Sequence, residues 1–277
     1  MRQWIGTAGL LLALLQAGRG SAADPAEVAG PVPALHAHAH NDYEHPRPLL
    51  DALDQGFCSV EADVWLTGGE LRVGHTLEAT APGRNLQRLY LEPLRQRIHA
   101  NGGRVYRDGP SITLLVDVKS DATNTYRALV RVLRHYQTLL TRFEPDRIVT
   151  NAITVIVSGN RSRELMARDR RRWAAYDGRF EDLDRADPPG LVPWISDNFA
   201  QHFTWRAGPQ EGAFPEAERA KLSQLVQRTH AQGRLIRLWG MPDTRASWQV
   251  QAEAGIDLIN TDDLKGLAAF LREKPRP

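Results

Sequence analysis

The sequence predicts an α/β protein, and more narrowly a (β/α)8 barrel in which eight parallel strands alternate with helices. Short apolar segments recur along most of the chain, helical patterns follow most of them, and neither an internal repeat nor an interdomain linker interrupts the series. The predicted strands outside one hairpin lie near residues 35, 59, 112, 153, 173, 192, 235 and 258.

The first two strands are separated by a short helix. The first strand is predicted at 34–39 and the second at 57–66. Between them, Pro48 opens the helix and Gly56 ends it. Residues 67–70 read Thr-Gly-Gly-Glu, which predicts a hairpin turn that folds the chain back along the second strand.

The third predicted strand, at 112–118, is the most continuously apolar one, as expected for a parallel strand buried on both faces. A helix at 86–100 precedes it, and an amphipathic helix from Tyr126 to Leu140 follows. The basic and then acidic run at 168–187 is typical of a solvated excursion. The later predicted elements are strands at 153–157, 173–176, 191–195, 235–239 and 258–260, and helices ending at Ala167 and spanning 215–232, 245–254 and 264–272.

The N-terminus has the pattern of a cleaved secretory signal. Arg2 precedes a short apolar run, and small residues follow up to Ala23. The sequence therefore predicts a signal peptide at 1–23, a disordered leader at 24–33, a barrel at 34–272 and a tail at 273–277, in a secreted or periplasmic protein.

Charge and cysteine content narrow the class of protein. The whole chain has a formal charge of +2, and loss of Arg2 and Arg19 with the signal leaves a neutral protein. A neutral chain argues against nucleic-acid binding, which needs a basic surface. Cys58 is the only cysteine, so no internal disulfide forms and a buried thiol is expected.

Three carboxylates follow two neighbouring predicted strands. Glu61 and Asp63 are two residues apart on the second strand and therefore share one face, and Asp117 ends the third strand. Two like charges side by side in an apolar run need a positive partner. Oxygen donors suit a hard cation, so we expect Glu61, Asp63 and Asp117 to bind one Mg²⁺ or Ca²⁺.

Two histidines and a lysine complete the predicted site. His40 follows the first strand, His75 follows the hairpin, and Lys119 shares a face with Asp117. Two imidazoles can exchange protons with a nucleophile and a leaving group, while the lysine and the metal stabilise a negatively charged phosphorus centre. We therefore predict His40 and His75 as catalytic residues and Lys119 as a substrate-binding one.

Other polar residues near predicted strand ends are candidates for substrate contact. Asn41, Arg161, Trp239 and Asn260 are included on this basis, although Arg161 could equally lie at the surface and Trp239 could pack in the barrel. Asp262 is expected to cap the last helix. The roles of His36, His38 and His202 are left open.

These residues carry a family resemblance. The chain resembles the glycerophosphodiester phosphodiesterases, of the phospholipase-C-like phosphodiesterase barrels, and within them the altered inheritance of mitochondria protein six family. The motifs are His40-Asn41-Asp42-Tyr43, Val60-Glu61-Ala62-Asp63-Val64-Trp65, Val73-Gly74-His75, Arg237-Leu238-Trp239-Gly240 and Ile259-Asn260-Thr261-Asp262-Asp263-Leu264. The resemblance implies a metal at the three carboxylates, catalysis by the two histidines, and phosphodiester cleavage.

Two departures from the glycerophosphodiesterases concern the substrate. They carry His-Arg-Gly where this chain has His40-Asn41-Asp42, so an arginine expected near the phosphate is absent from that loop. Their Glu-x-Lys on the third strand is Asp117-x-Lys119 here, which is similar to the sphingomyelinase D branch.

The sequence thus predicts a secreted, metal-dependent phosphodiesterase for a glycerophosphodiester or a phospholipid or sphingolipid headgroup. Its partners would be that small-molecule or lipid substrate and, transiently, a membrane surface, and we expect a monomer. Two alternatives remain. One is a barrel that binds a phosphate ligand without cleaving it, and the other is an amidohydrolase-type metal enzyme using His38 and His40.

Overall fold

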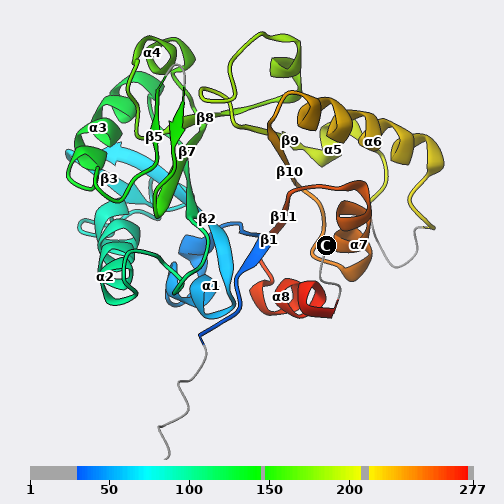
Figure 1. The fold of residues 1–277 in the computed structure, drawn as a ribbon, viewed down its shortest axis with the longest axis horizontal. Helices are drawn as coiled ribbons and strands as arrows, with labels where there is room; N and C mark the ends of the chain where they lie inside the picture. The colour runs from blue at the N-terminus through cyan, green and yellow to red at the C-terminus, as the bar shows by residue number, and fades with distance from the viewer. Residues whose placement is uncertain (1–29, 145–146, 207–211, 274–277) are drawn as a thin grey trace, which may run out of the picture.

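The computed structural model describes residues 30–144, 147–206 and 212–273 (Figure 1). The predicted signal peptide, most of the predicted leader and residues 274–277 lie outside the described residues. Within the described part, no helix combines the length and the apolar character needed to cross a membrane.

Eight parallel strands close into a barrel, which confirms the predicted fold class. Each strand pairs with its neighbour in chain order, and β1 pairs with both β2 and β11, so the sheet has no free edge. The barrel strands are β1 (Ala34–Ala39), β2 (Phe57–Thr67), β4 (Ile112–Val118), β7 (Ile153–Gly159), β8 (Ala175–Gly178), β9 (Trp194–Asn198), β10 (Leu235–Trp239) and β11 (Leu258–Thr261). The predicted hairpin is present as β3 (Glu70–Val73), antiparallel to β2.

Helices cover the outside of this sheet, with α2, α3 and α4 on one side and α5, α6 and α7 on the other (Figure 1). The α-helices are α1 (Leu50–Asp54), α2 (Glu92–Ala100), α3 (Ala122–Arg134), α4 (Arg163–Arg168), α5 (Phe199–His202), α6 (Glu216–Ala231), α7 (Arg245–Ala254) and α8 (Leu264–Glu273). Shorter helical turns are η1 (Asp42–Glu44), η2 (Gln87–Leu91) and η3 (Phe180–Asp184).

Three sequence predictions need correction. The helix predicted up to Leu140 ends at Arg134, and the chain then turns into a small antiparallel pair, β5 (Arg142–Phe143) and β6 (Ile148–Val149). The sixth barrel strand, β9, begins three residues later than predicted, because Leu191 ends a turn and Val192 lies in the connection between that turn and the strand. The run at 168–187 is not wholly solvated, since Asp177 is fully buried in β8.

The alternation of side chains along the strands separates a core from a polar lumen. On β2, Val60, Ala62 and Val64 pack outward against the helices, so Glu61 and Asp63, which alternate with them, face the barrel interior. The interior contains its own apolar cluster, which includes Leu115 and Ile156. Asp117 lies two residues beyond Leu115 on the same face, so polar side chains form the next layer, toward the C-terminal mouth.

Candidate active site

A pocket of about 220 Å³ opens at the C-terminal mouth of the barrel. It brings together residues from six of the eight barrel strands or the loops that follow them. Its lining consists of His40, Asn41, Glu61, Asp63, His75, Asp117, Lys119, Ser158, Arg179, Arg237 and Trp239. All the residues predicted for catalysis and metal binding are in this set.

The three predicted metal ligands converge because of strand register. Asp63 of β2 pairs directly with Asp117 of β4, so both project into the same layer of the lumen. Glu61 projects from the layer below. One carboxylate oxygen from each of the three residues lies within 4.8 Å of the others.

The two oxygens of Asp63 have very different surroundings. Oδ2 lies 2.7 Å from the Tyr43 hydroxyl, 3.2 Å from His75 Nδ1 and 3.1 Å from Lys119 Nζ. Oδ1 is buried and has no hydrogen-bond partner among the described residues. Buried oxygens without partners are rare in folded proteins, so this atom is where a cation would contribute most.

The electrostatics of the three acids also fit a divalent cation. Burial and the neighbouring charge of Glu61 raise the pKa of Asp117 to about 6, and the same two causes raise the pKa of Asp63. Lys119 offsets part of this repulsion. Burial alone would lower its pKa, but the charges of Asp117 and Asp63 outweigh burial and raise it, so Lys119 is an ammonium ion. The donor set of three carboxylates is the type that binds Mg²⁺ or Ca²⁺.

Glu61 is anchored on its other side by two residues deeper in the lumen. Its Oε2 lies 3.0 Å from Arg237 Nη1 and 3.1 Å from His38 Nε2. Burial would raise the pKa of Glu61, but the hydrogen bond to His38 and the charge of Arg237 hold it below its usual range. Burial and then Arg237 lower the pKa of His38 to about 4, so this histidine is neutral.

His38 has no ring nitrogen left for a metal. Its Nδ1 lies 2.7 Å from the Ser59 hydroxyl, and its Nε2 contacts both Glu61 and Arg237. His38 therefore orients the carboxylate rather than forming a metal pair with His40, which removes the geometric basis of the amidohydrolase alternative.

His40 lies at the rim of the pocket and is held by an aspartate from the last barrel strand end. Its Nδ1 is 2.8 Å from Asp262 Oδ1 and 3.0 Å from the Asn41 side-chain nitrogen. Burial alone would lower the pKa of His40, but the hydrogen bond to Asp262 and the charge of Glu61 outweigh it and raise the pKa. The predicted capping role of Asp262 is wrong, because Asp263 accepts the hydrogen bond from Gly266 N at the start of α8.

His75 approaches the acids from the opposite direction, on the loop after β3. Its Nδ1 lies 3.1 Å from the Tyr43 hydroxyl and 3.2 Å from Asp63 Oδ2. The side chain is 60% exposed, so the other ring nitrogen is accessible to a ligand in the mouth. Tyr43 keeps its proton, because burial and the charge of Asp63 raise its pKa.

A guanidinium group forms the wall opposite His75. Arg179 Nη1 lies 3.0 Å from Asp177 Oδ2, and the guanidinium stacks over the Trp239 ring at 4.7 Å. Asp177 also accepts hydrogen bonds from Ser158 (2.7 Å) and Ser196 (2.6 Å). Burial would raise the pKa of Asp177, but Arg179 and Arg237 outweigh it and lower the pKa, so a fixed anion holds Arg179 in place.

Two residues predicted to bind substrate lie outside the pocket lining. Asn260 accepts a hydrogen bond of 2.9 Å from Arg237 and so supports that side chain. Arg161 stacks over the Tyr176 ring at 4.7 Å. The other predicted contacts, Asn41, Lys119 and Trp239, do line the pocket.

Sequence reasoning assigned no role in the site to Tyr43, Arg179 or Arg237. Tyr43 and Arg237 occur in the motifs that carry the family resemblance. Tyr43 lies at the start of a loop and Arg237 on a barrel strand, and these positions could have indicated a role in the site. Arg179 had no signal beyond its place in a charged run.

The closed barrel, with its polar residues gathered at the mouth, has the fold of the phospholipase-C-like phosphodiesterase barrels. The family follows from the sequence. Residues 26–177 match the model of the AIM6-like phosphodiesterase domain, and the chain belongs to this family.

Relatives and a solved structure agree with this assignment. The chain is 30% identical over 273 residues to altered inheritance of mitochondria protein 6 of Eremothecium gossypii, which covers 86% of this chain and 70% of that protein. The protein of the same name from Zygosaccharomyces rouxii is 29% identical over 280 residues, covering 84% and 68%. A glycerophosphodiester phosphodiesterase from Parabacteroides distasonis superposes with a TM-score of 0.52 at 14% identity over 87% of this chain and 98% of its own, and shares the fold.

Proposed function

We propose that this protein is a metal-dependent phosphodiester hydrolase. The observation that carries the proposal is the environment of Asp63, whose Oδ2 lies within hydrogen-bond distance of three polar groups while its buried Oδ1 has no hydrogen-bond partner among the described residues. An acidic cluster with a buried oxygen left open, beside two histidines and two cations, suits a phosphate diester bound next to a divalent cation.

In this proposal Glu61, Asp63 and Asp117 hold the cation, which is Mg²⁺ or Ca²⁺. The chemistry that the bound ion supplies is neutralisation of charge on the phosphate oxygens. Lys119 and Arg179 add fixed positive charge on two sides of the pocket, where they bind and orient the phosphate.

The two histidines carry the proton transfers. His40 takes a proton from the attacking water while the new P–O bond forms, and Asp262 stabilises the resulting imidazolium. His75 gives a proton to the leaving oxygen as the old P–O bond breaks. Each histidine ends in the other protonation state, and exchange with solvent restores both.

The size and polarity of the pocket favour a small headgroup. A volume of about 220 Å³ accommodates a phosphate with a short polar substituent, and a long apolar chain would have to remain outside. We therefore propose a glycerophosphodiester, or the headgroup of a phospholipid or sphingolipid, as substrate. The pattern at residues 1–23 supports secretion, and transient contact with a membrane surface by a monomer would deliver a lipid substrate.

The test is hydrolysis of bis-p-nitrophenyl phosphate, glycerophosphocholine and a lysophospholipid, each with EDTA, Mg²⁺ or Ca²⁺. The His40→Ala variant should lose turnover, and His99→Ala should keep it, because His99 is an exposed residue of α2 away from the pocket. Phosphorus NMR of the product separates hydrolysis from formation of a cyclic phosphate. Metal binding without turnover of any diester would overturn the proposal in favour of a phosphate-binding barrel.

A further inference from the structure

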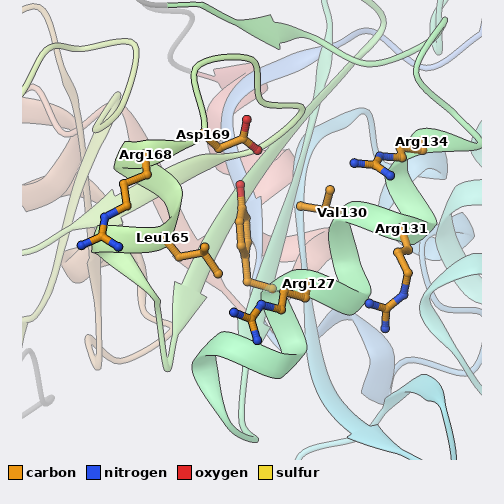
Figure 2. A pocket seen from close by; sticks show the side chains of 8 residues that line it. Arg127, Val130, Arg131, Arg134, Leu165, Arg168 and Asp169 are labelled. Atoms are coloured by element: carbon orange, nitrogen blue, oxygen red, sulfur yellow. The ribbon is translucent and has the colours of Figure 1, made fainter.

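A second concave region lies on the outer face of the barrel, between α3 and α4 (Figure 2). This region, the α3–α4 groove, has a volume of about 610 Å³, compared with about 220 Å³ at the mouth. Its lining is Tyr126, Arg127, Val130, Arg131, Arg134, Leu165, Arg168 and Asp169. None of these residues lines the mouth pocket, so the two sites are separate.

The α3–α4 groove is positively charged. Arg127, Arg131 and Arg134 follow one another at helical spacing on α3, so they lie along one face, as Figure 2 shows. All three are exposed, and none forms an ion pair with a described residue. Arg168 adds a fourth guanidinium from α4, and its exposed pairing with Glu164 at 4.0 Å is too weak to neutralise it.

The floor of the groove combines two apolar side chains with the Tyr126 hydroxyl, and the carboxylate of Asp169 also lines the groove. Val130 and Leu165 are half-buried and project between the two helices (Figure 2). Tyr126 is 3% exposed, and its hydroxyl has no hydrogen-bond partner in the described part of the chain. A buried hydroxyl in a groove normally finds a partner, so this atom points to a ligand with a polar group.

We propose that the α3–α4 groove binds an anionic amphiphile, with an oxyanion head held by the arginines and the Tyr126 hydroxyl, and an alkyl chain lying on Val130 and Leu165. Guanidinium groups are the preferred partners of phosphate and carboxylate. The apolar floor distinguishes the groove from a site for a simple anion.

The experiment is calorimetric titration of the full protein with decyl phosphate below its micelle concentration, in EDTA. Decanol, decanoate and inorganic phosphate are titrated in parallel. We expect decyl phosphate and decanoate to bind with one-to-one stoichiometry, and decanol and inorganic phosphate to bind at least about tenfold more weakly, which corresponds to about 1.4 kcal/mol.

Two double variants, each of which removes two positive charges, test where decyl phosphate binds. Arg127→Gln/Arg131→Gln should weaken decyl phosphate binding by roughly tenfold or more. Lys265→Gln/Arg272→Gln removes two exposed cations from α8, on another side of the barrel, and should leave it unchanged (Figure 1). Leu165→Ala should weaken decyl phosphate but not inorganic phosphate, with the fold checked by circular dichroism.

Several results would overturn the proposal. If decyl phosphate bound equally well to the two double variants, its site would lie outside the α3–α4 groove, and the mouth pocket would then be its site. Binding of decanol as tight as that of decyl phosphate would remove the role of the arginines. Binding of inorganic phosphate at the same affinity would remove the role of the apolar floor, and a lack of binding by both decyl compounds would exclude an amphiphile altogether.

Discussion

Asp42 gives the sharpest prediction about stability, because this acid is completely buried next to the mouth pocket. Its side chain is 0% exposed, and Oδ2 accepts a hydrogen bond of 2.6 Å from Leu49 N. That bond holds a backbone in which Leu49 has a positive φ of 66°, within the loop that carries Asn41 and Tyr43. Burial raises the pKa of Asp42 from 3.8 to about 7, although the hydrogen bond from Leu49 opposes it.

The direction of the pH dependence follows from this raised pKa. Between pH 4 and 7 the folded protein binds one proton more than the unfolded chain, so Asp42 lowers the free energy of unfolding as pH rises through this window. The window spans about three pH units at about 1.4 kcal/mol each, which amounts to about 4 kcal/mol. Below pH 4 the penalty is absent, and above pH 7 it is constant.

The perturbation is Asp42→Asn, which keeps an oxygen acceptor for Leu49 N and removes the ionisation. Urea unfolding of both proteins, in EDTA at pH steps from 4 to 8, measures the difference in free energy of unfolding. We expect this difference to move in favour of the variant by about 4 kcal/mol across the window, whatever its value at pH 4.

Asp51→Asn is the matched control, because the pKa of Asp51 is shifted in the direction opposite to that of Asp42. Burial is the largest single influence and would raise the pKa of Asp51, but the backbone and side-chain hydrogen bonds from Arg47 together outweigh it and lower the pKa. Removal of this carboxylate should therefore cost stability as pH rises. Parallel curves for wild type and Asp42→Asn from pH 4 to 8 would refute the reasoning, since they would mean that the buried carboxyl titrates as it does in the unfolded chain.

Two further predictions concern the site. Asp262→Asn keeps a hydrogen-bond acceptor beside His40 but removes the negative charge that helps to raise its pKa, so the acidic limb of the pH profile of kcat/KM should move to lower pH. A profile that stays in place would separate His40 from the observed proton transfer. Gly159→Ala places a Cβ 2.0 Å from Asp117 Oδ1, at a residue with φ +67°, so calorimetry should show divalent-ion affinity at least about tenfold weaker. Gly212→Ala, which adds a Cβ in open space, should bind the ion like wild type.

The barrel could be predicted because most of its strands are apolar on the face that the helices cover. β9 shows where this signal becomes weak. Its residues Ser196, Asp197 and Asn198 are polar, and the apolar residues that suggested the strand, Leu191 and Val192, lie in the turn and the connection before it. A strand can tolerate such residues when the lumen supplies partners, and Ser196 donates to the buried Asp177 of the neighbouring strand.

The acidic cluster was predictable for a related reason. Residues two apart on a strand share a face, and adjacent parallel strands end at the same side of the barrel, so Glu61, Asp63 and Asp117 could be placed together without coordinates. The partners of Glu61 could not be predicted from the sequence. Arg237 reaches Glu61 from a strand 176 residues away in sequence, and only closure of the barrel brings the two strands to opposite sides of one lumen.

The pocket has arginines on a different side from the one expected from the glycerophosphodiesterase pattern. Asn41 occupies the loop position where those enzymes have arginine, and its Oδ1 accepts a hydrogen bond of 2.8 Å from Tyr43. Arg179 and Arg237 instead flank Trp239, at 4.7 and 5.6 Å from its ring, on the wall formed by later strands. Arg237 is committed to Glu61, which leaves Arg179 as the guanidinium available to a phosphate.

Under the proposed function, this relocation affects which diester the pocket selects. A phosphate held between Lys119 and Arg179 lies toward the third and fifth strands of the barrel, away from the loop at Asn41. The space beside Asn41 is then left for the substituent of the diester, and a neutral amide there suits a hydroxyl or other uncharged polar group better than a second anion. Asn41 is therefore compatible with the proposed phosphodiester hydrolysis, and in that proposal it favours a headgroup different from that of the glycerophosphodiesterases.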